Sequence, residues 1–499
     1  MMRCSRSLGV VDRALSVQFH RLGLAIGRRP GYFLLVPVLL SLLAATGVQQ
    51  LRYQDDPEYL FSPETGRAKT ERALANRLFP SNFSAFNPGR ITDSGHFVRL
   101  MVTAPGGGSL LHTAAFDELV QLDRLVRAVE VDAGEEQWHY DQLCASWGDA
   151  CLDNVALRLQ PYVAGVESGA INLTFPVWFS DSFDMLLLAG TLGSPQLQDG
   201  VVTAAPALQM FYWVGNHVYF DVSVSLKWEM AVQEMLAGTT GQFQHINVSR
   251  FGSQTLKQEL DTNTVKVIPY MAVTVGLMIV FCVITTMMSD WVRAKPLLGL
   301  MGVASAVFGS GTAFGVLMYC QLEFIGINLA APFLMLGIGM DDTFVMLAAW
   351  RRTPIQDPVP QRMAKTYQDA AVSITITSLT NIISFLVGSI SPFPSVRIFC
   401  IYTGLSVLMT YLWHVLFFGA CMALSGYAER RNLHAVTFKP TLPVSESGSK
   451  SLAYRLFCSG GISETDPWNK NDNREHTLMV FFRDGVARAL NIPAVKGLT

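Results

Sequence analysis

Long apolar runs and one large polar region alternate along this chain. The apolar runs cover residues 31–48, 267–288, 297–320, 329–350, 370–390 and 398–424. An α-helix rises 1.5 Å per residue, so about 20 apolar residues cross the ~30 Å hydrocarbon core of a bilayer. The pattern therefore predicts six transmembrane helices, one before the polar region and five after it.

Residues 49–265 combine the two periodicities that distinguish strands from helices. Apolar residues recur at every second position in some segments and at helical spacing in others. We predict strands over 97–103, 208–214, 218–224 and 245–248, and helices over 114–131 and 226–236. This order of strands and helices predicts an α+β sandwich.

Arginines at the start of the chain predict its orientation in the membrane. Residues 1–30 carry one acid, Asp12, and six arginines: Arg3, Arg6, Arg13, Arg21, Arg28 and Arg29. Arginine-rich segments beside a span remain in the cytosol, which places 1–30 and the polar tail 425–499 there. The 49–265 domain is then luminal or extracellular. A cleaved signal peptide also starts with a basic lead, although this lead is long for one.

Glycosylation motifs and cysteines in the polar domain agree with that orientation. Asn82, Asn172 and Asn247 each begin an Asn-x-Ser/Thr motif, and all three lie within 49–265. Cys144 and Cys151 are close in sequence in the same domain, so we predict a disulfide between them if the domain is luminal. Two free thiols are the alternative.

Composition supports a polytopic membrane protein and argues against other classes. Only 15% of the residues are charged and 50% are hydrophobic, whereas globular chains carry about 25% charged residues. We find no concentrated basic patch, phosphate-binding glycine loop, metal-ligand spacing or nucleophile elbow. We therefore expect no enzyme, no catalytic residue, no metal site and no nucleic-acid partner.

An acid pair interrupts the apolar run 329–350. Asp341 and Asp342 lie well inside the segment, where a charged Asp costs at least ~2.5 kcal/mol, so a functional role is the default hypothesis. Consecutive residues point about 100° apart on a helix, so one acid faces a cavity or partner group and the other a neighbouring helix. Gly337 and Gly339 are small enough to let another backbone approach and exclude water.

Other polar residues within the apolar runs leave their roles open. Gly311 and Gly315 form a small-xxx-small pair that predicts close helix packing. Thr380 can bond its own backbone, whereas Asn381 needs a partner across a helix face, either in packing or along a polar pathway. His414 is either a hydrogen-bonding packing residue or a proton carrier.

The polar tail 425–499 contains two segments with distinct predictions. Residues 441–451 are rich in serine, which is typical of a flexible segment. Residues 476–490 mix polar and apolar positions and favour a helix at the membrane surface.

The acid pair carries a family resemblance. Gly337 and Asp341-Asp342 match a G-x-x-x-D-D motif, and the apolar lead Ala331–Gly337 contains Pro332. With one span, a large domain and five further spans, the chain resembles the Patched family, in particular its patched domain-containing branch. Residues 267–424 are similar to a sterol-sensing domain. The resemblance implies a resistance-nodulation-division (RND) fold with two six-span repeats, of which this sequence matches the first half.

The resemblance also implies a function. We expect the protein to handle sterol or another lipid, with a proton or monovalent cation bound at Asp341 and Asp342, because buried neighbouring carboxylates repel each other. The implied partners are membrane lipid or sterol and a second six-span half, in a homodimer or another chain; no cofactor is expected beyond a bound sterol. The implied location is the plasma membrane or an endomembrane, including ciliary or flagellar membrane. A sterol-binding receptor or scaffold, or a regulatory half-length fragment, is the alternative.

Overall fold

The computed structural model describes residues 2–491 with short gaps. The gaps are residues 89, 91–94, 134–135, 149, 181–183, 216–217, 220–221, 239–240, 289, 464–465, 467, 470–471, 473–479, 487 and 489–490. The chain divides into two compact units, residues 1–64 with 261–499, and residues 65–260. We call the first unit the helix bundle and the second the inserted domain.

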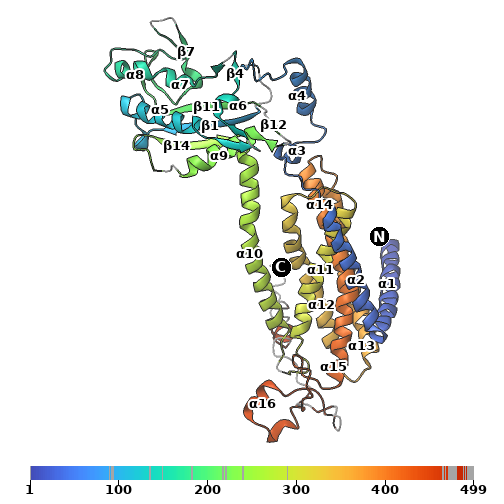
Figure 1. Ribbon diagram of the computed structural model, residues 1–499. Helices are drawn as coiled ribbons and strands as arrows, with labels where there is room; N and C mark the ends of the chain where they lie inside the picture. Colours follow the sequence, from blue (N-terminus) through green and yellow to red (C-terminus); the bar gives the residue numbers. More distant parts are fainter. Residues whose placement is uncertain are drawn as a thin grey trace. The chain divides into compact units, whose positions relative to one another are not determined.

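Long helices dominate the helix bundle (Figure 1). Its α-helices are α1 Met2–Arg28, α2 Pro30–Ala45, α3 Pro57–Phe61, α10 Thr255–Thr286, α11 Pro296–Tyr319, α12 Ala331–Arg352, α13 Val359–Gly388, α14 Pro394–Trp413, α15 Gly419–Arg430 and α16 Leu452–Phe457. Short 3-10 helices cover Thr46–Gln50, Gly326–Ala330 and Ser447–Ser449, and π-helices cover His414–Phe418 and Phe481–Val486.

Six helical stretches among the described residues are long and apolar enough to cross a membrane. They are Pro30–Gln50, Thr255–Thr286, Pro296–Tyr319, Gly326–Arg352, Val359–Gly388 and Pro394–Arg430. Each contains or overlaps one of the six predicted spans, so the prediction of six apolar helices is confirmed.

Besides α10, which begins at Thr255 and not at 267, two helices are longer than their apolar runs predict. α13 begins at Val359 and not at 370, because Pro358 and Pro360 stand at its start, where proline favours a helix. The last span extends to Arg430 and not to 424, since its final turns bury the polar residue Glu429 among other helices. Apolar runs therefore underestimate both helices where polar residues are packed inside.

Glycines of α11 set its close contacts with three other helices. A Cβ added at Gly302 would lie 2.5 Å from Thr343 Oγ1 of α12, and one at Gly309 would lie 2.7 Å from Thr410 Cα of α14. One at Gly315 would overlap the Ala44 carbonyl of α2. At Gly311, no atom of the described residues lies within 4 Å of that position. The predicted close packing therefore holds for Gly315 and is wrong for Gly311, because the two face different surroundings.

The basic N-terminal segment is also helical. α1 runs alongside α13 (Figure 1), and Ile26 is fully buried between them and their neighbours. The sequence indicated only its charge, because its apolar positions are too few to resemble a span.

The tail folds back onto the connector between α10 and α11. Trp291 stacks on His434, with ring centroids 5.2 Å apart, and its Nε1–H donates to the Leu456 carbonyl at 2.7 Å. The Gly461 N–H donates to Asp290 Oδ1 at 3.1 Å. Burial raises the pKa of Asp290, while Arg293 and the backbone N–H donors oppose that rise.

The serine-rich segment 441–451 is structured, contrary to the flexible segment that we predicted. Ser447 is fully buried, and the Ser445 hydroxyl and N–H both donate to the buried carboxylate of Asp472, at 2.7 and 2.9 Å. These long-range bonds satisfy polar groups that composition alone would leave to solvent. Residues 476–479, 487 and 489–490 of the predicted surface segment 476–490 lie outside the described residues; Phe481–Val486 forms a π-helix.

The inserted domain is a mixture of short helices and antiparallel sheets. Its α-helices are α4 Arg67–Leu78, α5 Thr113–Arg127, α6 Tyr140–Leu143, α7 Val155–Arg158, α8 Gln160–Glu167 and α9 Val224–Gly238, with 3-10 helices at Pro105–Gly107 and Leu188–Gly190. Its strands are β1 His96–Thr103, β2 Val131–Ala133, β3 Glu136–Trp138, β4 Ser146–Trp147, β5 Ala150–Cys151, β6 Val177–Phe179, β7 Met185–Leu187, β8 Leu192–Gly193, β9 Gln196–Gln198, β10 Val201–Ala204, β11 Ala207–Val214, β12 Val218–Tyr219, β13 Val222–Ser223 and β14 Asn247–Gly252.

The main sheet of this domain packs one face on helices. Its strand order is β14-β1-β11-β8, with antiparallel neighbours. Alternate residues of β1 and β11, such as Leu100 and Met210, are fully buried with Phe116 and Leu119 of α5 and Trp228 of α9. The predicted α+β class is confirmed, because period-2 burial in the strands meets the apolar stripes of two helices.

Two strand predictions in this domain need correction. Residues 218–224 form the short strands β12 and β13, and Val224 already begins α9. β14 covers Asn247–Gly252 and not 245–248, because an edge strand exposed on one face carries polar residues that the apolar pattern misses. The Cys144–Cys151 disulfide is present, with Cα atoms 5.6 Å apart, as predicted.

Candidate functional site

The acid pair lies in the middle of α12, and its two members have different surroundings. Asp342 is only 5% exposed, whereas Asp341 is exposed on the surface of the bundle. The Asp342 N–H donates to Asp341 Oδ1 at 2.8 Å. One acid thus faces inward and the other outward, as the 100° step between helical neighbours requires.

The buried acid has no positively charged neighbour in the structure. Among the described residues, Asp342 forms no ion pair within 4.0 Å, and its carboxylate forms no hydrogen bond. It interacts electrostatically with Tyr411, whose hydroxyl shares a 2.9 Å hydrogen bond with Thr375. A buried carboxylate without a counter-ion is costly in its ionised form. A proton or a small cation would remove that cost.

A polar cluster of neutral side chains follows the acid pair along α12. Thr343 Oγ1 and Ser305 Oγ each lie 3.0 Å from His414 Nε2, and all three side chains are fully buried. The cluster joins α11, α12 and the π-helix His414–Phe418, because each contributes one member.

Hydrogen bonding indicates one neutral tautomer for His414. Its Nδ1 lies 3.0 Å from the Thr410 carbonyl, which can only accept, so Nδ1 carries the proton and Nε2 accepts from Thr343 or Ser305. The ring lies at the start of the π-helix, a distortion that is frequent at functional sites. The structure therefore shows His414 as a buried hydrogen-bonding residue next to the acid pair, and the proton-carrier alternative stays a prediction.

The two glycines of the motif differ in their packing. A Cβ at Gly339 would meet Thr410 Cγ2 at 2.9 Å and His414 Cε1 at 3.3 Å, so this glycine lets α12 approach α14 closely. At Gly337, no atom of a described residue lies within 4 Å of that position. The predicted close approach holds for Gly339 and is wrong for Gly337, which lies on the same exposed side as Asp341.

The two polar candidates of α13 stay apart from the cluster. Thr380 is exposed, and its hydroxyl donates to its own helix at the Ile376 carbonyl, 2.8 Å away. Asn381 is half-buried, and within the described part of the chain its side chain forms no hydrogen bond. The structure thus shows no packing bond for Asn381 among the described residues, and its role along a polar pathway stays a prediction.

A second buried acid of the bundle is fully paired. Glu429, at the end of α15, lies 2.8 Å from Lys295 Nζ and 3.2 Å from Arg362 Nη1, and all three side chains are at most 5% exposed. Trp350 Nε1–H also donates to this carboxylate, at 3.4 Å, and the Arg362 guanidinium lies 3.9 Å from the Trp350 ring centroid. The group joins the ends of α11, α12, α13 and α15. We call this region of the bundle its tail end.

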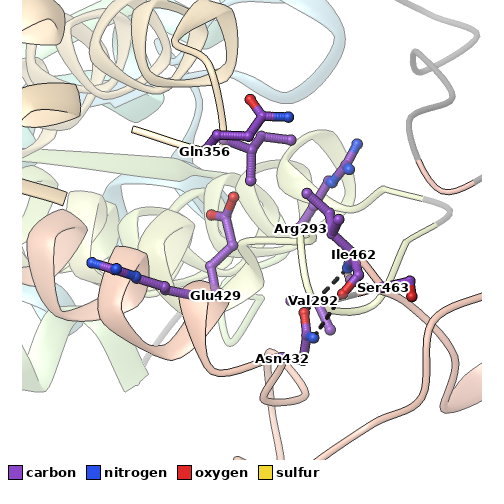
Figure 2. Close-up of a pocket in the computed structure, with 10 residues that line it drawn as sticks. Val292, Arg293, Gln356, Glu429, Asn432, Ile462 and Ser463 are labelled. Carbon is purple, nitrogen blue, oxygen red and sulfur yellow. Dashed lines mark hydrogen bonds between the residues drawn. The ribbon is translucent and has the colours of Figure 1, made fainter. Parts of the chain in front are cut away.

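A cavity of about 270 Å³ opens beside this ion-pair group (Figure 2). Arg293, Gln356 and Glu429 line it, together with Asn432 and the tail residues Gly461–Ser463. In Figure 2, Asn432 is hydrogen-bonded to Ile462, through bonds of 3.0 and 3.2 Å. The cavity is lined by the connectors and the tail and not by the acid pair. Among the described residues, no group of three or more His, Cys, Asp or Glu side chains could hold a metal ion.

Several residues of the site were missed by sequence reasoning. Ser305, Thr343, Thr410 and Tyr411 lie in apolar runs where isolated hydroxyls are common and bond their own backbone. Ser305 stands between Gly302 and Gly309, the two close-packed glycines of α11, which is the one signal that a contact occurs there. Glu429 was assigned to the polar tail, and nothing nearby in sequence indicates its partners.

Comparisons with known proteins agree with this arrangement. A family model for Patched, described as the Patched SSD (sterol-sensing domain), matches residues 265–424. That range contains α11 to α14 and the whole acid pair and polar cluster. The chain is similar to Patched-family sterol-sensing-domain proteins. It is a multi-pass membrane protein with six apolar helices among its described residues.

Curated relatives cover different shares of the chain. Patched-related protein 9 of Caenorhabditis elegans is 26% identical over 430 residues, which are 82% of this chain and 49% of that protein. Protein patched homolog 2 of Mus musculus is 27% identical, over 54% of this chain and 24% of its own length. A Niemann-Pick type C1-related protein of Toxoplasma gondii is 31% identical, over 34% and 14%. The chain thus matches half or less of the length of these curated relatives.

Proposed function

We propose that this Patched-family protein handles sterol or another membrane lipid. We also propose that Asp342 binds and releases a proton or monovalent cation each time the protein handles a lipid molecule. One observation carries the proposal: Asp342 is 5% exposed and has no ion pair among the described residues. Binding and release of a charge at this point changes the cost of burying the carboxylate. The change acts on α12, which contacts α14 through Gly339 and α11 through Thr343.

The orientation is part of the proposal. We place α1, the connectors 287–295 and 353–358 and the tail in the cytosol, and the inserted domain on the luminal or extracellular side. Arg351 and Arg352 at the end of α12 and the six arginines before α2 support this placement. The side chains of Asn82, Asn172 and Asn247 are all exposed in the inserted domain, which suits glycosylation there.

Asp341 is assigned a different role from Asp342. It lies on the exposed side of α12 with Gly337, next to the half-exposed apolar residues Leu334 and Val345. A polar residue on such a surface is costly against lipid hydrocarbon. A second six-span half, from another copy or another chain, would cover this side and place its own helix beside the acid pair.

The test is a double substitution of the acid pair. Asp341→Asn with Asp342→Asn should abolish sterol efflux, or the change in membrane sterol accessibility, and leave surface expression intact. Thr380→Val is the matched control, because Thr380 is a polar residue of a span that faces away from the cluster. Unchanged sterol handling in the double variant would refute the proposal.

A sterol-binding receptor or scaffold without transport is the second candidate. It is favoured by the similarity of residues 265–424 to a sterol-sensing domain. Photo-crosslinking of a sterol probe to α10–α14 that is equal with and without Na⁺ or a pH gradient would favour this candidate. A cation-dependent crosslinking yield that Asp342→Asn removes would favour transport.

A further inference from the structure

The C-terminal half of α1 is fixed to the polar start of α13 by two glycines. A Cβ at Gly27 would lie 2.6 Å from Pro360 Cα, and one at Gly23 would lie 2.7 Å from the Met363 carbonyl oxygen. The spacing is a Gly-x-x-x-Gly motif, which lets two helix backbones approach closely. The Tyr427 hydroxyl donates to the Gly27 carbonyl at 2.8 Å, so α15 also holds this segment.

The opposite face of α1 carries arginines. Arg13, Arg21 and Arg28 are all exposed, and at 3.6 residues per turn they fall within an arc of about 80° that points away from Gly23 and Ile26. Arg29 follows directly and is also exposed. None of these four arginines forms an ion pair with another described residue within 4.0 Å. We call this surface the arginine face.

The position of the arginine face limits what can cover it. Gly27 and Gly23 lie beside Pro360 and Met363, in the first turns of α13, where Arg362, Lys365 and Asp369 mark its polar end. α1 itself is not among the helices that are apolar enough to span a membrane. Arg21 and Arg28 are therefore held at the flank of a membrane-spanning helix near its polar end, whereas Arg13 lies further along α1.

We propose that the arginine face binds the headgroups of anionic phospholipids, such as phosphatidylserine, in the cytosolic leaflet. Guanidinium groups pair with phosphate and carboxylate through two parallel hydrogen bonds, and basic surfaces beside a membrane attract anionic lipids. α1 would then hold an anionic lipid beside α13, the helix that follows the acid-bearing α12. The proposal rests on the membrane orientation proposed above and not on sterol transport.

The experiment measures binding of a fluorescent short-chain phosphatidylserine to the full-length chain in neutral detergent. Each arginine near an anionic surface contributes about five-fold in affinity. Arg21→Gln with Arg28→Gln should therefore weaken binding about 25-fold. The matched control is Arg77→Gln with Arg124→Gln, two exposed arginines of the inserted domain, and it should bind as the native chain does. Size-exclusion profiles of both variants should match that of the native chain.

Three outcomes would overturn the proposal. One is equal binding by the Arg21/Arg28 variant and the control, and another is equal affinity for phosphatidylcholine. Complete displacement of the lipid by inorganic phosphate would show a site for small anions and not for lipid headgroups. Asp342→Asn should bind phosphatidylserine normally, so unchanged sterol handling in that variant, with lipid binding retained, would reject the transport proposal alone.

Discussion

Two buried acids in the same bundle, Asp342 and Glu429, have opposite surroundings. Glu429 is held by Lys295 and Arg362, and Trp350 adds a third donor. Asp342 is equally hidden from solvent, yet among the described residues it has no ion pair and its neighbours Tyr411 and Thr343 are neutral. The difference separates an acid whose charge is compensated by the fold from one whose charge is not.

The difference also predicts which acid can change its state. A carboxylate with two cations at hydrogen-bond distance gains nothing from a proton, so Glu429 ties the tail ends of the helices together permanently. A carboxylate without a counter-ion is relieved by any proton or monovalent cation that reaches it. We therefore expect a permanently paired acid, Glu429, at the tail end of the bundle, and an acid that exchanges a proton or cation, Asp342, within α12.

The largest expected effect on the free energy of unfolding is at Glu429, the paired acid. Glu429→Gln leaves Lys295 and Arg362 buried without a negative partner, which should lower the free energy of unfolding by about 3–5 kcal/mol. Unfolding in mixed micelles by a denaturing detergent measures it. The control is Asp357→Asn, which breaks the exposed Asp357–Lys365 pair at 2.7 Å and should cost about 0–1 kcal/mol. Similar losses in both variants would remove the distinction between the two acids.

An intermediate effect is expected in the neutral cluster beside Asp342. His414→Leu keeps an apolar group in the space but deprives Thr343 and Ser305 of their shared acceptor. Ser305 can still donate to the Gly302 carbonyl, so we expect a loss of about 1–3 kcal/mol in the same unfolding assay. Thr380→Val, whose hydroxyl bonds only its own helix, should cost less than about 0.5 kcal/mol. No difference between the two would show that the cluster does not hold α11 and α12 together.

The smallest effect on the free energy of unfolding is expected at Asp342. Asp342→Asn replaces a buried acid that has no ion-pair partner with a neutral amide of similar size, so the unfolding free energy should stay within about 0.5 kcal/mol of the native value or increase. Asp341→Asn, on the exposed side of α12, should change the unfolding free energy equally little. A destabilisation by Asp342→Asn as large as that of Glu429→Gln would mean that Asp342 is a structural acid with an unrecognised counter-ion.

Sequence patterns predict those parts of this protein that depend on local period and length. Six apolar helices, the strands β1 and β11 and the Cys144–Cys151 pair follow from such patterns. The acid pair was found because a charge inside an apolar run is conspicuous. Glu429 was missed because it lies beyond the apolar run, where acids are normal, and its importance comes from partners 134 and 67 residues away (429 − 295 and 429 − 362).

Sequence spacing also fails to reveal which glycines are close-packed against another helix. The spacing of Gly311 and Gly315 suggested a packing pair, yet Gly302 and Gly309 make the contacts that hold the polar cluster. A glycine has no side chain whose character would reveal its partner, so only the tertiary arrangement identifies which of the glycines in α11 are close-packed. The same reason explains why the Gly23/Gly27 contact of α1 was not predicted.

Infrared spectroscopy of the reconstituted protein in Na⁺-free buffer tests the central claim most directly. Because Asp342 has no counter-ion in the bundle, the native chain at neutral pH should show the C=O stretching band of a protonated carboxylic acid. The band should disappear in Asp342→Asn, weaken when Na⁺ binds in place of the proton if Asp342 accepts that ion, and persist in Glu429→Gln. A native spectrum without the band in Na⁺-free buffer, identical to that of Asp342→Asn, would contradict the account.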